Sequence, residues 1–244
     1  MIPLNLIVNA DDFGINNSVN KAILFAFQEG YINSTSLIPN REGYEGAVKI
    51  YHNNKAILKH IGVHVNLADG MPVTKFNIKA FVKANGEWDI GETGKKLQFF
   101  SKQTTNFFKT EIKAQIIKVL SSEVPVTHLD SHLHLHTLPK FMTIFLELAA
   151  EFNLKLRLAQ TYKEDDLFKF LFRRFLNNKI KRNALNYSDK FETVDHFLLS
   201  PHSNHNLSTE IMLHPCFDEQ NNLTDHYMPS DMYNWLNFYR SYKA

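Results

Sequence analysis

The chain has 244 residues, of which 44% are hydrophobic and 13% aromatic, so it is long enough for a substantial core and its composition excludes disorder. Its 27 basic and 25 acidic residues give a formal charge of +2, which excludes a bulk electrostatic attraction to nucleic acid. A single cysteine, Cys216, excludes an intramolecular disulfide and a zinc site built from several cysteines.

Short apolar runs alternate with helical patterns along the chain. In the first half of the chain we predict a strand at 4–9, a helix at 18–30, a strand at 34–38, a helix at 43–51, a strand at 61–67, a long loop at 70–100 and a helix at 107–120. In the second half we predict a strand at 126–130, a helix at 139–152, a strand at 155–159, an amphipathic helix at 169–182, strands at 197–199 and 211–213, and a closing helix at 233–242. The long loop holds four glycines and little periodicity, which indicates functional potential.

This alternation is typical of a parallel sheet that helices cover on both faces. We therefore predict an α/β fold, a TIM-like (β/α) barrel of about seven parallel strands, in one domain over residues 1–244. A doubly wound sheet is the alternative. Both architectures bind ligands at the carboxyl ends of the strands, so the expected place of the site is the same.

The beginning of the chain predicts no export. The first residues, MIPLNLIVNADDFG, lack the basic segment of a signal peptide and turn acidic at Asp11. No apolar run approaches the ~20 residues that a membrane span needs. A lone cysteine is compatible with a reducing compartment. These features predict a cytoplasmic protein without a membrane or nucleic-acid partner.

Polar side chains follow four of the predicted strands at their carboxyl ends. They are the pair Asp11-Asp12, His64, the run Asp130-Ser131-His132, and His214. If the strands are parallel, all four groups meet at one rim, which random placement rarely gives. Imidazole and carboxylate ligands favour zinc, iron, cobalt or manganese. One carboxylate and two histidines leave positions open for water, as in catalytic sites.

The adjacent aspartates suit such a site. One carboxylate binds the metal, and its neighbour accepts a proton from the attacking water without being consumed as a ligand. Each feature alone also has a structural interpretation. Paired aspartates often form a turn or a helix cap, and the four histidines at even positions from 128 to 136 suit a polar strand face.

Four motifs carry a resemblance to a known family. VNADDFG (8–14), GVHVNL (62–67), THLDSHLHLH (127–136) and MLHP (212–215), in this order and at these approximate separations, resemble the YdjC-like or ChbG-like carbohydrate deacetylases. The resemblance implies a distorted TIM-like (β/α) barrel that removes acetyl groups from N-acetylated mono- or oligosaccharides such as chitooligosaccharides. It also implies one divalent metal ion (Mg²⁺, Zn²⁺, Co²⁺ or Mn²⁺) and is compatible with a homodimer.

Carried onto this sequence, the resemblance assigns the general base, the general acid and three metal ligands. These are Asp11 as base, His214 as acid, and Asp12, His64 and His132 as ligands. Arg157 occupies a position at which the family often has an arginine near the site. It either orients Asp11 or forms an ion pair on the surface. Leu133 replaces a histidine that the family often has directly after the ligand. The motif at the third predicted strand reads GVHVNLADGMP, where the family usually has GLHLNLT-G-P, and this difference leaves the substrate preference open.

Two stretches beyond these motifs have functional interpretations. Trp88, Phe99 and Phe100 lie in or beside the long loop and are candidates for stacking on a sugar, although loop aromatics often pack internally. The run KFLFRRFLNNKIKR (169–182) is basic and amphipathic. It suits either an anionic surface or partner, or a solvated helix that packs its Phe and Leu side.

Three classes of function compete. The first is the sugar N-deacetylase. The second is another barrel metallohydrolase, such as a phosphoesterase. A further metalloenzyme to compare with this second class, a non-haem iron oxygenase, shares the set of two histidines and one carboxylate, but it needs neither Asp11 nor His214. The third is a non-catalytic sugar-binding protein, which would be expected to lose the base or the acid, and both are present.

Overall fold

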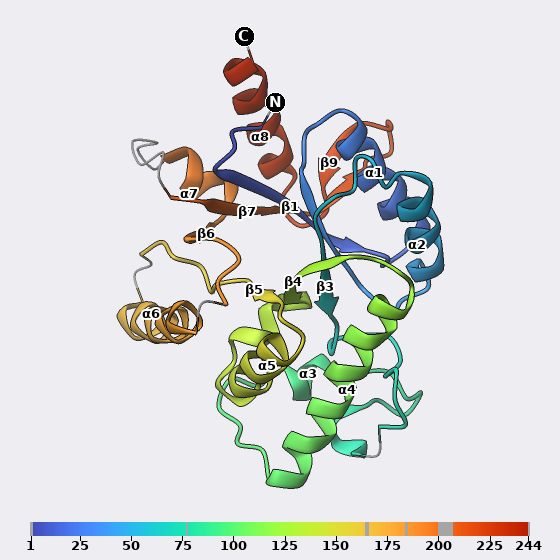
Figure 1. The fold of residues 1–244 in the computed structure, drawn as a ribbon, viewed down its shortest axis with the longest axis vertical. Helices are drawn as coiled ribbons and strands as arrows, with labels where there is room; N and C mark the ends of the chain where they lie inside the picture. The colour runs from blue at the N-terminus through green and yellow to red at the C-terminus, as the bar shows by residue number, and fades with distance from the viewer. Residues whose placement is uncertain (1, 77, 164–165, 184, 200–206, 244) are drawn as a thin grey trace.

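A curled sheet of seven parallel strands forms the centre of this computed structural model (Figure 1). The structure describes residues 2–76, 78–163, 166–183, 185–199 and 207–243. The strands are β1 (Leu6–Phe13), β2 (Ser34–Leu37), β3 (Ile61–Val65), β4 (Val126–Ser131), β5 (Lys155–Leu156), β6 (Lys190–Glu192) and β7 (Thr209–Leu213). They lie in the order β5-β4-β3-β2-β1-β7-β6, and each neighbouring pair is parallel.

Helices cover the outside of this sheet (Figure 1). They are α1 (Asn17–Gln28), α2 (Tyr44–Asn53), α3 (Ile90–Thr93), α4 (Lys102–Ser121), α5 (Pro139–Glu151), α6 (Leu167–Arg182), α7 (Val194–Leu199) and α8 (Pro229–Lys243), with the 3-10 turns η1 (Lys79–Phe81) and η2 (His132–Thr137). α1 packs on β1 and α2, whereas α4 packs on β3 and α5. In the described part of the chain, no helix has both the length and the apolar character that crossing a membrane requires.

Hydrogen bonds between the two edges of the sheet curl it toward a barrel. The N–H of Tyr187, just before β6, donates to the carbonyl of Leu156 in β5 at 3.1 Å. Beyond β5, the N–H of Thr161 donates to the carbonyl of Phe191 in β6 at 2.9 Å. The predicted fold class, α/β with seven parallel strands in a distorted TIM-like barrel, is confirmed.

Local sequence explains most of the elements. All five residues of β3 are buried, as expected of a central strand in a parallel sheet. α1 buries a stripe that includes Ile23 and Phe27, four positions apart. Its cap is Asn16, whose side chain accepts a hydrogen bond from the N–H of Val19, so the helix begins earlier than the predicted start at residue 18.

The predicted long loop is packed against α4 and not open. Glu111 on α4 accepts hydrogen bonds from the backbone N–H groups of residues 73 and 74, at 2.9 and 2.8 Å. Trp88 is fully buried and stacks on Phe108 of α4, with 5.9 Å between ring centroids. Phe100 also stacks on Phe108, at 4.8 Å. Trp88 is therefore a core residue and is not available for stacking on a sugar.

Three predicted elements differ from the structure. The apolar run at 197–199 lies in α7, because a run of three residues does not distinguish a strand from a helix. β6 was not expected, since Lys190 and Glu192 flank its single apolar residue. β1 continues through Asp11 and Asp12, where the sequence predicts that it ends.

Candidate metal centre

The end of β1 directs both aspartates to the inside of the rim. Neighbouring strand residues normally face opposite sides. Here the pairing of β1 with β2 shifts register between Ala10 and Phe13, and Asp12 takes a left-handed conformation with φ of 69°. Such a bulge re-aims a side chain, and aspartate tolerates this conformation better than most residues. As a result Asp11 and Asp12 both lie buried near His64.

Asp12, His64 and His132 form the candidate metal site. Asp12 Oδ1 lies 2.8 Å from His132 Nδ1 and 3.3 Å from His64 Nε2. One ligand atom from each of the three residues lies within 4.8 Å of the others, and all three side chains are buried. The sequence predicts these three as ligands, and the structure brings them together from β1, β3 and the end of β4. Their donor set of one carboxylate and two imidazoles fits a divalent cation.

Asp130 orients one of these imidazoles. The Nδ1 of His64 lies 2.7 Å from Asp130 Oδ1, while its Nε2 faces Asp12. A metal-binding histidine commonly donates its other ring N–H to a carboxylate, which fixes the tautomer and the ring orientation. The pairing of His64 with Asp130 is of this kind.

The electrostatics of the site suit a cation. Burial raises the pKa of Asp12, but hydrogen bonds from His132 and His64 outweigh this and hold it well below its usual value. Burial lowers the pKa of His64, yet the charges of Asp130 and Asp11 more than compensate and raise it to about 10. The carboxylates thus attract positive charge to His64, and a proton and a metal ion compete for its Nε2.

Arg157 holds Asp11 in place from inside the barrel. Its guanidinium is fully buried and donates to both carboxylate oxygens of Asp11, at 2.6 and 2.7 Å. It also donates to Glu210 at 2.7 Å, and lies 2.9 Å from Asp130 Oδ2. Of the two roles considered from sequence, the structure therefore places Arg157 on Asp11. Burial raises the pKa of Asp11, but the Arg157 charge outweighs this and lowers it, so the carboxylate stays ionised and able to accept a proton.

A second group of possible ligands, Asp11, His64 and Asp130, also lies within 4.8 Å. Here the guanidinium of Arg157 already supplies the positive charge between Asp11 and Asp130. A cation would have to displace a buried arginine. Of the two groups, Asp12, His64 and His132 are therefore the better candidates for a metal site.

His214 follows β7 and is held by a hairpin that the sequence does not reveal. The strands β8 (Pro215–Phe217) and β9 (Leu223–Asp225) pair antiparallel and bring Asp225 back to His214. Asp225 accepts a hydrogen bond from the backbone N–H of His214, and its Oδ1 lies 3.6 Å from His214 Nδ1. The ring of Tyr227 packs edge-on against His214, at 4.6 Å between centroids. Burial lowers the pKa of His214, but Asp225, Asp11 and Asp12 together raise it, which favours the protonated form that an acid needs.

The remaining histidines of the run buttress the site. His128 stacks on Tyr187, with 4.0 Å between ring centroids, and burial lowers its pKa to about 3. His136 Nδ1 lies 2.8 Å from the hydroxyl of Ser131. Leu133 and His134 both have left-handed backbones, with φ of 53° and 54°. These conformations cost of order 1–3 kcal/mol per residue and accompany a sharp turn of the chain directly after the candidate ligand His132.

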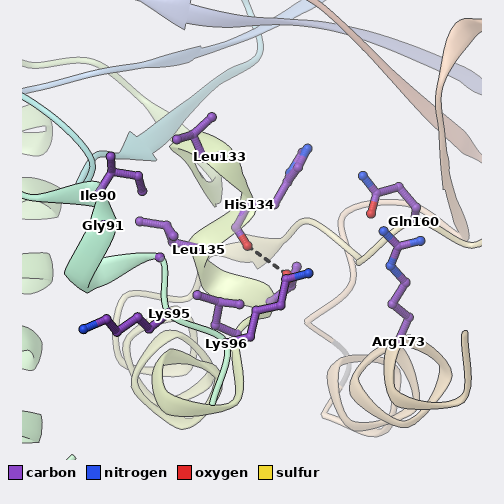
Figure 2. A pocket seen from close by; sticks show the side chains of 12 residues that line it. Ile90, Gly91, Lys95, Lys96, Leu133, His134, Leu135, Gln160 and Arg173 are labelled. Atoms are coloured by element: carbon purple, nitrogen blue, oxygen red, sulfur yellow. Dashed lines mark hydrogen bonds between the residues drawn. The ribbon is translucent and has the colours of Figure 1, made fainter. Parts of the chain in front are cut away.

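A pocket of about 530 Å³ opens next to η2 (Figure 2). Its lining comes from η2, the segment after α3 and the neighbourhood of α6, and consists of Ile90, Gly91, Gly94, Lys95, Lys96, Leu133, His134, Leu135, Thr137, Leu138, Gln160 and Arg173. Figure 2 shows Lys95 and Lys96 on one side and Gln160 and Arg173 on the other. The pocket thus adjoins the turn that carries His132. Sequence patterns do not bring these distant segments together.

Comparison with known proteins identifies the family of the chain. The model of the family described as YdjC-like protein matches residues 5–239. The chain belongs to this family. The carbohydrate deacetylase of Brevibacillus brevis is 28% identical to this YdjC-like protein over 224 residues, which cover 91% of this chain and 85% of the relative. That of Vibrio parahaemolyticus is 30% identical over 223 residues, covering 89% and 80%.

A solved structure shares the fold of this YdjC-like protein. It is the crystal structure of a protein from Enterococcus faecalis V583 described as a cellobiose-phosphate cleavage protein. It matches with a TM-score of 0.70 at 22% sequence identity, covering 95% of this chain and 88% of the other. At this identity the likeness concerns the fold alone.

Proposed function

We propose that this YdjC-like protein is a metal-dependent carbohydrate deacetylase, which hydrolyses the amide bond of an N-acetylated mono- or oligosaccharide. The convergence of Asp12, His64 and His132 beside the Arg157-bound Asp11 carries this proposal. The two relatives named carbohydrate deacetylase support the class of substrate. The metal is Zn²⁺, Mg²⁺, Co²⁺ or Mn²⁺.

Each polar residue then has a role in the reaction. A divalent ion held by Asp12, His64 and His132 would supply an activated water and polarise the acetyl carbonyl. Asp11 accepts the proton of the attacking water, and Arg157 keeps this carboxylate ionised and oriented. His214 donates a proton to the amide nitrogen as the C–N bond breaks, with Asp225 holding the imidazole. Water and amide thereby become acetate and a free amine.

The pairing of a base and an acid argues against the competing iron oxygenase. That chemistry uses two histidines and one carboxylate on the metal. It has no use for a carboxylate fixed by a buried arginine, nor for a histidine held by a second carboxylate. Hydrolysis needs both.

Acetate release tests the proposal directly. The protein is stripped with a chelator, reloaded with one metal at a time, and incubated with N-acetylglucosamine oligomers of increasing length. We expect release of acetate to disappear on stripping and to return with at least one of the four metals. If a metal binds but no acylated sugar releases acetate, the chain is another metallohydrolase or a non-catalytic sugar-binding protein.

The ion pair between the His214 imidazole and Asp225 predicts a shift in the pH profile. Asp225→Asn removes the charge that helps to keep His214 protonated, so the pKa of His214 should fall. The form active as an acid is lost as pH rises through this pKa, so the alkaline limb of kcat/KM should move to lower pH. Rate measurements across pH 5–10 on wild type and variant test this. An unmoved alkaline limb would exclude His214 as the group that limits activity there.

The pocket beside η2 predicts a dependence on oligosaccharide length. Gln160 is half-buried in its wall and offers a neutral donor and acceptor for sugar hydroxyls. If the pocket holds the neighbouring sugar, Gln160→Ala should raise KM for a disaccharide about two- to tenfold and leave kcat/KM for the monosaccharide unchanged. Equal effects on both substrates would place Gln160 outside the subsite.

A further inference from the structure

α6 presents an apolar stripe to solvent. Phe168 is 86% exposed, Leu171 50% and Phe175 51%. Residues of a helix are ~100° apart, so positions 168, 171, 172 and 175 lie within one arc of about 100°. The sequence allows a solvated helix that packs its Phe and Leu side, and the structure shows that this stripe is not the packed side.

The opposite side of α6 already holds the helix on the protein. Leu176, Asn177 and Ile180 are its buried residues. Asn177 also accepts a hydrogen bond from the N–H of Ala159 and donates one to its carbonyl, at 2.8 and 2.9 Å. The outward stripe is therefore a second apolar face. Among the described residues, no other helix exposes as many large apolar side chains.

Positive charge surrounds this stripe. α6 contains six basic residues and no acidic one, which leaves 21 basic and 25 acidic residues in the remainder of the chain. Arg174, Lys179 and Arg182 are exposed, and the Lys179 ammonium lies 5.1 Å from the centre of the Phe175 ring. The nearest acidic residues in sequence, 164–166, precede the helix. The protein thus concentrates its positive charge on one amphipathic helix.

The positive charge of α6 decides between two possible partners for the stripe, a second copy of the chain and a lipid membrane. A second copy with α6 on the two-fold axis would bring the same cationic helix against itself, and like charges oppose such a contact. A helix with an exposed apolar face and flanking cations is the type that lies in the interface of an anionic bilayer. We propose that α6 docks this protein on an anionic lipid membrane, with its aromatic stripe at the acyl boundary and its basic residues among the headgroup phosphates.

Docking through α6 also places the candidate site near the bilayer. Arg173 of the same helix lines the pocket beside η2 (Figure 2). That pocket would lie about one helix diameter, ~10 Å, from the membrane. The proposal concerns a peripheral contact and not a membrane span. It revises the expectation from sequence that the chain has no membrane partner.

Vesicle co-sedimentation tests the proposal. The full chain is mixed with vesicles of equal parts phosphatidylglycerol and phosphatidylcholine, or of phosphatidylcholine alone, at low and high salt. We expect binding to the anionic vesicles only, with a loss at high salt. The double variants Phe168→Ser/Phe175→Ser and Arg174→Glu/Lys179→Glu should each lower the partition coefficient at least tenfold.

Matched variants on other helices control for general surface effects. Ile117→Ser on α4 replaces a 43% exposed apolar residue, and Lys21→Glu on α1 reverses an exposed charge. Both should bind vesicles like wild type. Acetate release from a soluble substrate should be unchanged in every variant, so loss of docking is distinguishable from loss of the proposed deacetylase activity.

Three outcomes of the vesicle experiment would overturn the proposal. They are no binding of the wild type to anionic vesicles, binding that the α6 variants retain, and equal losses in the control variants. Light scattering tests whether the stripe instead joins two copies of the chain. A dimer that dissociates in Phe168→Ser/Phe175→Ser would show that the stripe joins two chains, and would also overturn membrane docking.

Discussion

Replacing Asp12 with alanine should abolish metal binding and acetate release together, whereas Asp11→Asn should leave the metal bound and lower only turnover. Asp12 lies between His132 and His64, at 2.8 and 3.3 Å, so its loss removes the single carboxylate of the ligand set. Asp11 is held by Arg157 and is the proposed general base. Loss of a general base costs about 10²–10⁴-fold in kcat.

Metal content and kcat, measured on the same preparations, separate the two roles. Metal content is determined by elemental analysis after dialysis, and kcat from acetate release. Asn is chosen at position 11 because its amide oxygen can still accept a hydrogen bond from Arg157. Glu219→Ala, at an exposed carboxylate in the β8–β9 turn, is the matched control and should change neither quantity. Equal loss of metal in Asp11→Asn and Asp12→Ala would contradict the division of labour.

The strands that carry the ligands could be predicted because burial dictates their composition. β3 is an apolar run with His64 near its carboxyl end, β4 ends in Asp130 and Ser131, and parallel pairing aligns Asp130 directly with His64. Given seven such runs, the convergence of Asp12, His64 and His132 follows from topology. The family motifs then assign a role to each residue, which the measurements above would test.

Most of the supporting contacts could not be predicted from local sequence, because the partners are distant in the chain. Asp11 and Arg157 are 146 positions apart, and only the family resemblance offers their contact, as one of two alternatives. Burial of polar groups at the end of β1 is tolerated only because this arginine and the imidazoles compensate the charges. Asp225 was missed since β8 and β9 have three residues each, too few for a periodic pattern. The left-handed conformations of Asp12, Leu133 and His134 depend on the same tertiary contacts.

Arg157→Met should be among the most destabilising single substitutions in this protein. The guanidinium is fully buried and compensates three buried carboxylates, those of Asp11, Asp130 and Glu210. Removing one partner of a buried ion pair typically costs about 3–5 kcal/mol, because the other charge remains without compensation. Urea denaturation at pH 7 measures the loss. Arg41→Met is the matched control: its ion pair with Asp69 is partly exposed, so it should cost at most about 1 kcal/mol.

The pH dependence of this loss identifies its cause. In wild type, burial raises the pKa of Asp11 and of Asp130, but the charge of Arg157 helps to lower both below their usual values. The stability that these two carboxylates contribute is therefore present above their pKa in the unfolded chain, ~4, and is lost as pH falls through their pKa values in the folded protein. Without Arg157, burial should instead raise the pKa of these carboxylates, and the variant should take up protons on folding. Its deficit relative to wild type should therefore shrink as pH falls from 7 to 5. A deficit that is constant over this range would mean that lost packing, and not uncompensated charge, is what Arg157→Met removes.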